Sequence, residues 1–192
     1  MTRTFVAIFP PANVTAAIDA AVAPLRAGTG RAGLKWERAA NLHYTVRFLG
    51  PLAPAEVEAA RRAVVAAAAG GVPFRVRLGG AGAFPGPTRP RVLWLGVADG
   101  ALPLVTLAGD VERALVRQRF AAAERPFTPH LTIARVGEGA LPTAETAIAA
   151  FLGLAPPALE FAVSELQLVA STLAPGGSRY EVLERAPLGG SA

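Results

Sequence analysis

The chain has 192 residues, the size of one ordinary domain or of one domain built from two small lobes, and we treat residues 1–192 as a single domain. Hydrophobic residues make up 52% of the chain and charged residues 17%, so apolar material for a core is ample and the signature of disorder is missing. The absence of cysteine excludes disulfides, thiolate nucleophiles and iron–sulfur clusters. No apolar run has the length of a membrane span or a signal-peptide core, so we expect a cytoplasmic protein without a membrane partner.

The net charge is +5, and Lys35 is the only lysine, so nearly all of the positive charge is arginine. Guanidinium groups match phosphate oxygens, and this excess therefore favours an anionic partner. A biased genome composition explains the same excess without any partner. Charge alone leaves both interpretations open.

Short strands and helices alternate in the first half of the chain. Residues 11–25 carry apolar side chains at helical spacing, and residues 54–69 form a helix that begins at a proline and ends before two glycines. Residues 74–78 alternate between apolar side chains and arginine, which is typical of a sheet with one covered and one open face. The strands predicted in this half are residues 4–8, 34–36, 42–49 and 74–78.

Residues 79–91 contain four glycines and three prolines, and we predict a long loop that connects two lobes or acts as a lid. A helix with an apolar stripe follows over residues 102–119, and a last helix over residues 142–152. The strands predicted in this half are residues 92–97, 130–136, 159–163, 165–171 and 179–183, with the final pair joined through residues 175–177.

Several of these strands are joined by links too short for parallel crossovers, which predicts an α+β fold with antiparallel sheets. The chain also repeats itself once, at an offset of 87 residues, in the frame E-R-x4-H-x-T-x4-G. A single repeat is too short for a solenoid. We therefore expect two pseudo-symmetric lobes, each an antiparallel sheet with helices on its outer face, that enclose a central cleft.

The two histidines of the chain open matching tetrads, H-Y-T-V from His43 and H-L-T-I from His130. Alternation along a strand turns each histidine and its threonine, Thr45 or Thr132, to the same side. Such a set suits phosphodiester hydrolysis: one neutral imidazole takes a proton from water, one protonated imidazole gives a proton to the departing oxygen, and the hydroxyls hold phosphoryl oxygens. A zinc site would have to recruit distant carboxylates, so we expect no metal and no cofactor.

Further segments extend the likeness between the two tetrads into a family pattern. They are F-V-A-I from Phe5, N-L-H-Y-T-V-R-F-L-G from Asn41, F-P from Phe84, P-R-V-L-W from Pro90, R-P-F from Arg125 and P-H-L-T-I-A-R from Pro129. Over nearly its whole length the chain resembles the two-histidine phosphoesterases, and among them the bacterial and archaeal RNA 2′,3′-cyclic phosphodiesterases, formerly called 2′-5′ RNA ligases. Tyr44 and Val46 stand where that family often has leucine, an apolar exchange that leaves the chemistry intact.

The resemblance implies a two-lobed α+β fold with a basic cleft and hydrolysis of a terminal 2′,3′-cyclic phosphate on RNA to a 2′-phosphate. The first histidine of the family is the proton donor and the second the acceptor, which implies these roles for His43 and His130, with Thr45 and Thr132 beside them. The repeat alone does not assign the two roles. We expect an RNA with a cyclic phosphate end, or a cyclic nucleotide, as the partner of a monomeric enzyme.

Two further residues are candidates for substrate binding. Arg135 stands where the family carries an arginine after the second motif, which implies a phosphate contact, whereas strict alternation predicts a surface charge unless a bulge intervenes. Phe48 is a candidate for stacking on the terminal base, but the same alternation turns it away from His43 and favours core packing. Four arginines are either guides for an RNA strand or a solvated basic face: Arg75, Arg77, Arg89 and Arg91.

Two other functions remain open from the sequence. The reverse reaction, ligation of a cyclic phosphate to a 5′-hydroxyl through a 2′-5′ linkage, needs the same groups. A nucleotide- or RNA-binding module without turnover would keep the cleft, although two complete tetrads argue against it.

Overall fold

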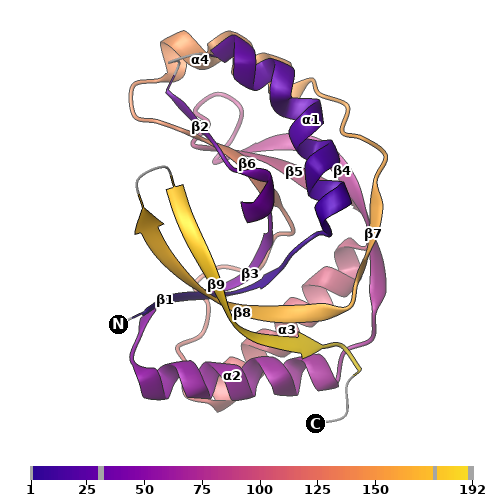
Figure 1. Cartoon of the computed structure of the whole chain (residues 1–192), viewed down its shortest axis with the longest axis vertical. Helices are drawn as coiled ribbons and strands as arrows, with labels where there is room; N and C mark the ends of the chain where they lie inside the picture. Colours follow the sequence, from indigo (N-terminus) through magenta and orange to yellow (C-terminus); the bar gives the residue numbers. More distant parts are fainter. Residues whose placement is uncertain (1, 30–32, 175–176, 190–192) are drawn as a thin grey trace.

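The computed structural model describes residues 2–29, 33–174 and 177–189, which form helices and strands interspersed along the chain. This composition confirms the predicted α+β fold class. The elements, labelled as in Figure 1, are β1 (Thr2–Ile8), α1 (Ala12–Thr29), β2 (Leu34–Trp36), the short 3₁₀ helix η1 (Ala39–Asn41), β3 (Tyr44–Leu52), α2 (Pro54–Ala69), β4 (Phe74–Phe84), β5 (Val92–Asp99), α3 (Ala101–Arg117), β6 (Leu131–Val136), α4 (Leu141–Leu152), β7 (Glu160–Val163), β8 (Glu165–Ala174) and β9 (Gly177–Pro187).

The strands form one curled sheet in the order β7-β4-β5-β6-β3-β1-β8-β9, and β2 also pairs with β6 (Figure 1). The two central strands, β3 and β6, are antiparallel and meet at one pair, Tyr44 with Leu131. Strands β5 and β4 flank β6 on one side of this pair as β1 and β8 flank β3 on the other, which is the pseudo-twofold arrangement that the repeat predicts. The two expected sheets are therefore joined into one at their centre.

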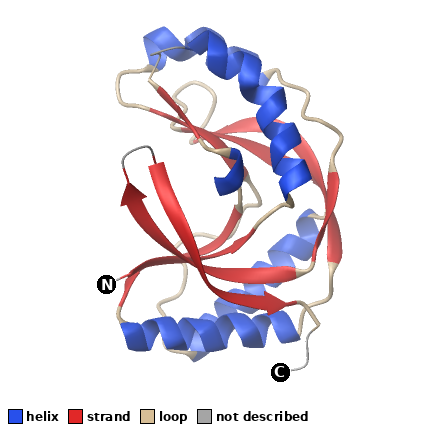
Figure 2. Ribbon diagram, viewed as in Figure 1, coloured by secondary structure: helices blue, strands red, loops and turns tan. Residues whose placement is uncertain are grey.

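Two pairs of helices cover the outer side of the curled sheet (Figure 2). Helix α2 packs against α3, β8 and β9, and α3 also packs against β3. Helix α1 packs against α4, which also packs against β4. Helices α1 and α2 come from the first repeat, and α3 and α4 come from the second. Each packed pair of helices, and hence each lobe, therefore combines segments from both repeats.

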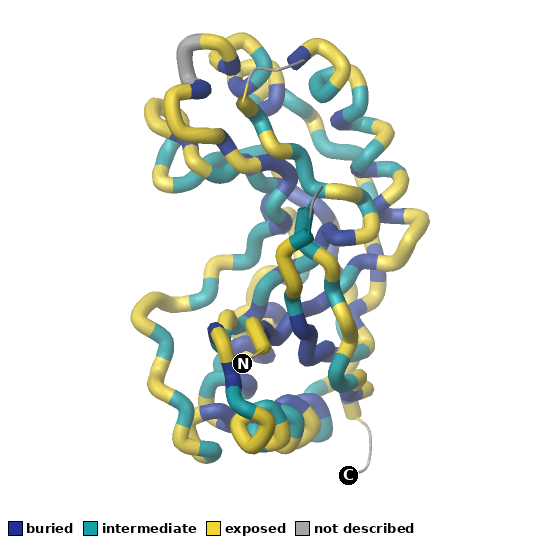
Figure 3. The backbone as a smooth tube through the Cα atoms, turned by 60° about the vertical axis from the view of Figure 1, so that its left-hand side comes forward, coloured by how far each residue is buried: buried dark blue, intermediate teal, exposed yellow. Residues whose placement is uncertain are grey.

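The apolar faces of the helices and of the sheet form one large core, whose segments are dark blue in Figure 3. The stripe predicted on α3 is buried in it: Leu104, Leu107, Val111, Ala114 and Leu115. Burial of apolar surface stabilises a fold by about 25 cal/mol per Å². The side chains of β1, β3 and β6 that enter this core leave their alternate neighbours on the opposite face of the sheet.

The predicted loop over residues 79–91 is wrong in its first half, because β4 continues to Phe84 and the loop covers only residues 85–91. This loop joins two neighbouring antiparallel strands, β4 and β5, and does not connect the lobes. The glycine at position 82 makes room for a neighbour instead of ending the strand. A Cβ atom there would lie 2.3 Å from ring atoms of Trp94, so only glycine lets that indole lie close against β4.

Other boundaries differ from the prediction at the ends of elements. Helix α1 continues to Thr29 with Pro24 inside it, and α3 ends at Arg117. Strands β8 and β9 are longer than predicted, and residues 175–176 of the expected connection between them lie outside the described residues. None of the helices in the described part of the chain is long and apolar enough to span a membrane.

Tyr44 provides a test of the central strand pair. Its side chain is fully buried, its ring stacks on Phe161 at 6.3 Å, and no described group forms a hydrogen bond with its phenol oxygen. An unpaired buried hydroxyl costs about 1–3 kcal/mol, and burial also raises the pKa of Tyr44. We predict that Tyr44→Phe raises the free energy of unfolding in urea by about 1 kcal/mol and leaves turnover unchanged.

Tyr180→Phe is the control, because Tyr180 is only partly buried and removing its hydroxyl should not stabilise the protein. A loss of stability in Tyr44→Phe would show that its hydroxyl has a partner.

Candidate active site

His43 and His130 each stand immediately before the residue that joins the two halves of the sheet. The Nδ1 atom of His43 lies 2.6 Å from the carbonyl oxygen of Asn41, and Nδ1 of His130 lies 2.8 Å from that of Thr128. A carbonyl oxygen only accepts hydrogen bonds, so both Nδ1 atoms donate and Nε2 is the atom that gains or loses a proton. The two imidazoles are held in the same way, as the repeat predicts.

The face of the sheet that is turned away from the helices, called the inner face below, carries a small aromatic cluster. It consists of Phe5, Ala7, Val169, Phe9 and Tyr180. The ring of His43 packs against this cluster, with centroid distances of 4.9 Å to Phe5 and 5.3 Å to both Phe9 and Tyr180. Aromatic contacts of this kind contribute about 0.5–1.5 kcal/mol each, and here they restrict the orientation of the imidazole.

His130 has its own aromatic neighbours in the other half of the sheet. Its ring lies 5.0 Å from Phe84 and 6.5 Å from Trp94, edge to face in both cases. Trp94 pairs with Thr132 across β5 and β6, which puts these two side chains on the same face. In the first half, the hydroxyl of Thr45 lies 2.9 Å from Nε2 of His43. Both predicted histidine and threonine pairs are therefore on the inner face.

No motif in the sequence assigns a role to the aromatic neighbours of the two histidines. Phe5 and Trp94 belonged to the family pattern, but no local signal placed them beside the imidazoles. The position of Tyr180 follows only from the register of the hairpin of β8 and β9.

The expectation that Phe48 packs into the core is wrong, because its side chain is 47% exposed. A β-bulge causes the difference: Ala7 pairs with Thr45 but Val6 pairs with Arg47, so Val46 is an extra residue in β3. The bulge restarts the alternation, and Phe48 pairs with Phe5 on the inner face. The guanidinium of Arg3 lies 5.0 Å from the centroid of the Phe48 ring, a cation–π contact.

Arg135 reaches the inner face by an equivalent bulge. Trp94 pairs with Thr132 but Leu93 pairs with Ala134, so the extra residue in β6 is Ile133. As a result Arg135 pairs with Val92 on the face that carries Thr132. Its side chain is exposed, and its Nε atom lies 3.5 Å from Oε1 of Glu37, which leaves the terminal nitrogens for another anion.

The charges around the site act on His43. Burial lowers the pKa of His43, the hydrogen bond with the Asn41 carbonyl opposes that effect, and the positive charges of Arg135 and His130 lower the pKa further. The pKa of Tyr180 is raised, mainly by its burial.

These residues can transfer protons on both sides of a bound anion. Two imidazole Nε2 atoms, two hydroxyls and a guanidinium face the same region, and histidine changes protonation near neutral pH. Within residues 2–29, 33–174 and 177–189, no three side chains of histidine, aspartate or glutamate gather as a metal site would require.

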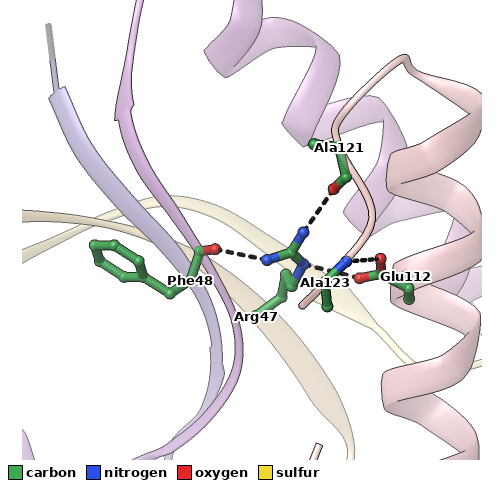
Figure 4. A network of polar contacts seen from close by, with 5 residues as sticks. All are labelled: Arg47, Phe48, Glu112, Ala121 and Ala123. Carbon is green, nitrogen blue, oxygen red and sulfur yellow. Dashed lines mark hydrogen bonds and ion pairs between the residues drawn. The ribbon is translucent and has the colours of Figure 1, made fainter. Parts of the chain in front are cut away.

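Arg47 ties the strand of the first histidine to the segment that leads to the second (Figure 4). Its Nε atom lies 2.8 Å from Glu112 on α3, and a terminal nitrogen donates to the Ala121 carbonyl at 2.6 Å. Glu112 accepts from the backbone N–H of Ala123 at 2.7 Å, and Arg47 also donates to the carbonyl of Phe48 at 3.1 Å. These four bonds, called the Arg47 clasp below, hold residues 121–123 against β3.

Comparison with known proteins places this site in context. The sequence profile of the 2′-5′ RNA ligase superfamily matches residues 10–173. The RNA 2′,3′-cyclic phosphodiesterase of Thermus thermophilus is 34% identical over 98% of this chain and 91% of its own, and that of Aquifex aeolicus is 32% identical over 81% and 82%. A crystal structure of Escherichia coli LigT complexed with 3′-AMP matches with a TM-score of 0.74 at 30% identity, over 97% of this chain and 98% of that chain.

The Arg47 clasp predicts a loss of both stability and turnover in Arg47→Gln. Breaking charge-assisted bonds at this half-buried position should lower the free energy of unfolding by about 1–2 kcal/mol. Loosening the segment before His130 should slow turnover about tenfold, because small displacements of catalytic groups are costly. Urea unfolding and steady-state kinetics measure the two effects.

Arg113→Gln on the same helix is the matched control, since Arg113 pairs with Asp110 at an exposed position and should lose less than about 0.5 kcal/mol. Equal losses of stability in the two variants, or full activity in Arg47→Gln, would contradict a positioning role for the clasp.

Proposed function

The chain belongs to the 2′-5′ RNA ligase superfamily, and we propose that it is an RNA 2′,3′-cyclic phosphodiesterase in which His43 and His130 act as acid and base. Its substrate is an RNA that ends in a 2′,3′-cyclic phosphate. Its product carries a 2′-phosphate and a 3′-hydroxyl. The names of the relatives and their coverage of nearly the whole chain support this activity.

One observation carries the proposal more than any other. The Nδ1 hydrogen bonds of both histidines go to backbone carbonyls, which leaves both Nε2 atoms on the inner face for proton transfer. A pair of imidazoles, one neutral and one protonated, is what in-line displacement at phosphorus needs: a base for the incoming water and an acid for the departing oxygen.

The reaction then proceeds in one displacement. Nε2 of His130 takes a proton from a water molecule as the water oxygen bonds to phosphorus. The bond between phosphorus and the 3′-oxygen breaks, and Nε2 of His43 gives its proton to that oxygen. The direction of this assignment follows the resemblance to the family, because the two sites have similar geometry. A proton shift through solvent restores the starting forms.

The remaining candidates bind the substrate. The Thr45 hydroxyl, which contacts Nε2 of His43 in the free protein, turns to a phosphoryl oxygen, and Thr132 does the same from the other strand. Arg135 offers its terminal nitrogens to the phosphate. Phe48 presents an exposed ring on the same face for the terminal base, and stacking there is worth about 1–3 kcal/mol.

The direct test is incubation of the pure protein with an RNA that ends in a 2′,3′-cyclic phosphate. We expect a product heavier by one water molecule that resists a phosphatase specific for 3′-phosphates. Addition of an RNA with a 5′-hydroxyl tests the reverse reaction, because ligation would give a longer product with a 2′-5′ linkage. Binding without any product would identify a non-catalytic module and contradict the proposal.

Removing either imidazole should remove one side of acid–base catalysis. We predict that His43→Ala and His130→Ala each lower kcat by about 10² to 10⁴. The fold loss in the double variant should be far smaller than the product of the two single losses, because both residues act on one transition state. Thr45→Val and Thr132→Val should also lower kcat while keeping the β-branched shape.

Thr172→Val is the control for the threonines, because Thr172 is exposed near the end of β8 and should leave kcat unchanged. Folded single histidine variants with wild-type turnover would exclude the paired mechanism.

The pH dependence follows from the lowered pKa of His43. The donor must be protonated and the base neutral, so the rate should fall at both ends of the pH range, and the two limbs belong to the coupled pair of histidines. Bound phosphate is negative and raises the pKa of His43, so the basic limb of kcat should lie at higher pH than that of kcat/KM. In Arg135→Gln, loss of a positive charge should move the basic limb of kcat/KM to higher pH.

Arg185→Gln is the matched control, because Arg185 pairs with Glu165 at the surface and should leave the limb in place. A shift to lower pH in Arg135→Gln would show that Arg135 does not act on the donor.

A further inference from the structure

A hollow of about 420 Å³ lies between the loop of residues 85–91 and the turn that follows β6. Three charged side chains line it, Arg89 and Arg91 from the loop and Glu138 from the turn. The other lining residues are Pro85, Pro90, Gly137 and Gly139. The hollow is therefore lined by two arginines and one carboxylate, with a net positive charge.

Backbone hydrogen bonds connect this hollow directly to the candidate active site. The N–H of Arg91 donates to the carbonyl of Phe84 at 2.7 Å, and the N–H of Val136 donates to the carbonyl of Arg91 at 3.0 Å. Phe84 is the residue whose ring packs against His130, and Val136 directly follows Arg135. The backbone of Arg91 is thus held between Phe84, which contacts His130, and Val136, which follows Arg135.

The two arginines of the hollow are not engaged by carboxylates. In the described part of the chain, neither Arg89 nor Arg91 forms an ion pair, whereas Arg47, Arg61 and Arg75 each do. Both are exposed, and Pro90 between them is buried. Proline restricts the backbone, so the loop presents its arginines with little further entropy to lose on binding.

We propose that this hollow binds a backbone phosphate of the RNA chain upstream of the cyclic end. The inference rests on the proposed function, whose catalytic groups engage only the terminal phosphate. RNA carries a negative charge at every nucleotide, and single strands bind to basic grooves that follow the backbone. Arginine presents a fork of donors that matches phosphate oxygens. Glu138 opposes the phosphate and limits the affinity of the hollow.

The experiment compares two substrates that differ only in the RNA chain beyond the terminal nucleotide. A mononucleotide 2′,3′-cyclic phosphate lacks all upstream phosphates, whereas an oligoribonucleotide of several nucleotides with the same end carries them. We expect Arg89→Gln and Arg91→Gln each to raise KM for the oligonucleotide about fivefold and to leave kcat/KM for the mononucleotide unchanged. The slope of log KM against log salt should fall by about 0.7 for each arginine removed.

Two further variants test whether the charge of the hollow and the position of its arginines matter for binding. Glu138→Gln should lower KM for the oligonucleotide, because it removes a negative charge from the hollow. Arg77→Gln removes an exposed arginine of β4 that does not line the hollow, and it should leave KM and kcat/KM unchanged for both substrates. Equal effects on both substrates, a matching effect of Arg77→Gln, or a higher KM in Glu138→Gln would overturn the proposal. Failure of the wild-type protein to hydrolyse even the mononucleotide would instead refute the proposed function.

Discussion

The pairing of Tyr44 with Leu131 determines where the two histidines of this protein lie. It is the single pair that the described residues form between β3 and β6, and each of its members directly follows a histidine. Because the two strands are antiparallel, this pairing brings the equivalent ends of two distant tetrads together across a pseudo-twofold axis. The side chains of Tyr44 and Leu131 are buried in the core, so alternation along the strands places the histidines and threonines on the opposite face of the sheet.

The two bulges extend this arrangement and also make it asymmetric. Val46 and Ile133 are equivalent in the repeat, and each restarts the alternation of its strand, so that Phe48 and Arg135 reach the inner face at equivalent positions. The same backbone distortion thus presents an aromatic ring on one side and a guanidinium on the other. A symmetric scaffold in this way presents two different groups at equivalent positions, and we propose that the ring binds the terminal nucleobase and the guanidinium binds the phosphate.

Local periodicity explains which features the sequence predicts. The paired tetrads and the apolar stripe of α3 depend on neighbours along the chain, and the structure has them where they were expected. Alternation fails for Phe48 because nothing in the sequence marks a bulge at Val46. Gly82 resembles a loop signal because its partner, Trp94, lies on another strand. The Arg47 clasp has no counterpart in the second repeat, where the equivalent residue is Ala134, so the repeat does not reveal it.

We propose that the two imidazoles act on opposite oxygens of one phosphorus, His43 on the departing 3′-oxygen and His130 on the attacking water. A cyclic substrate with sulfur in place of the 3′-oxygen tests this most directly, because a thiolate departs without a proton while the attack on phosphorus is unchanged. We expect the sulfur substrate to restore most of the lost single-turnover rate in His43→Ala and little of it in His130→Ala. Equal restoration in both variants, or restoration in His130→Ala alone, would contradict the assignment of acid and base.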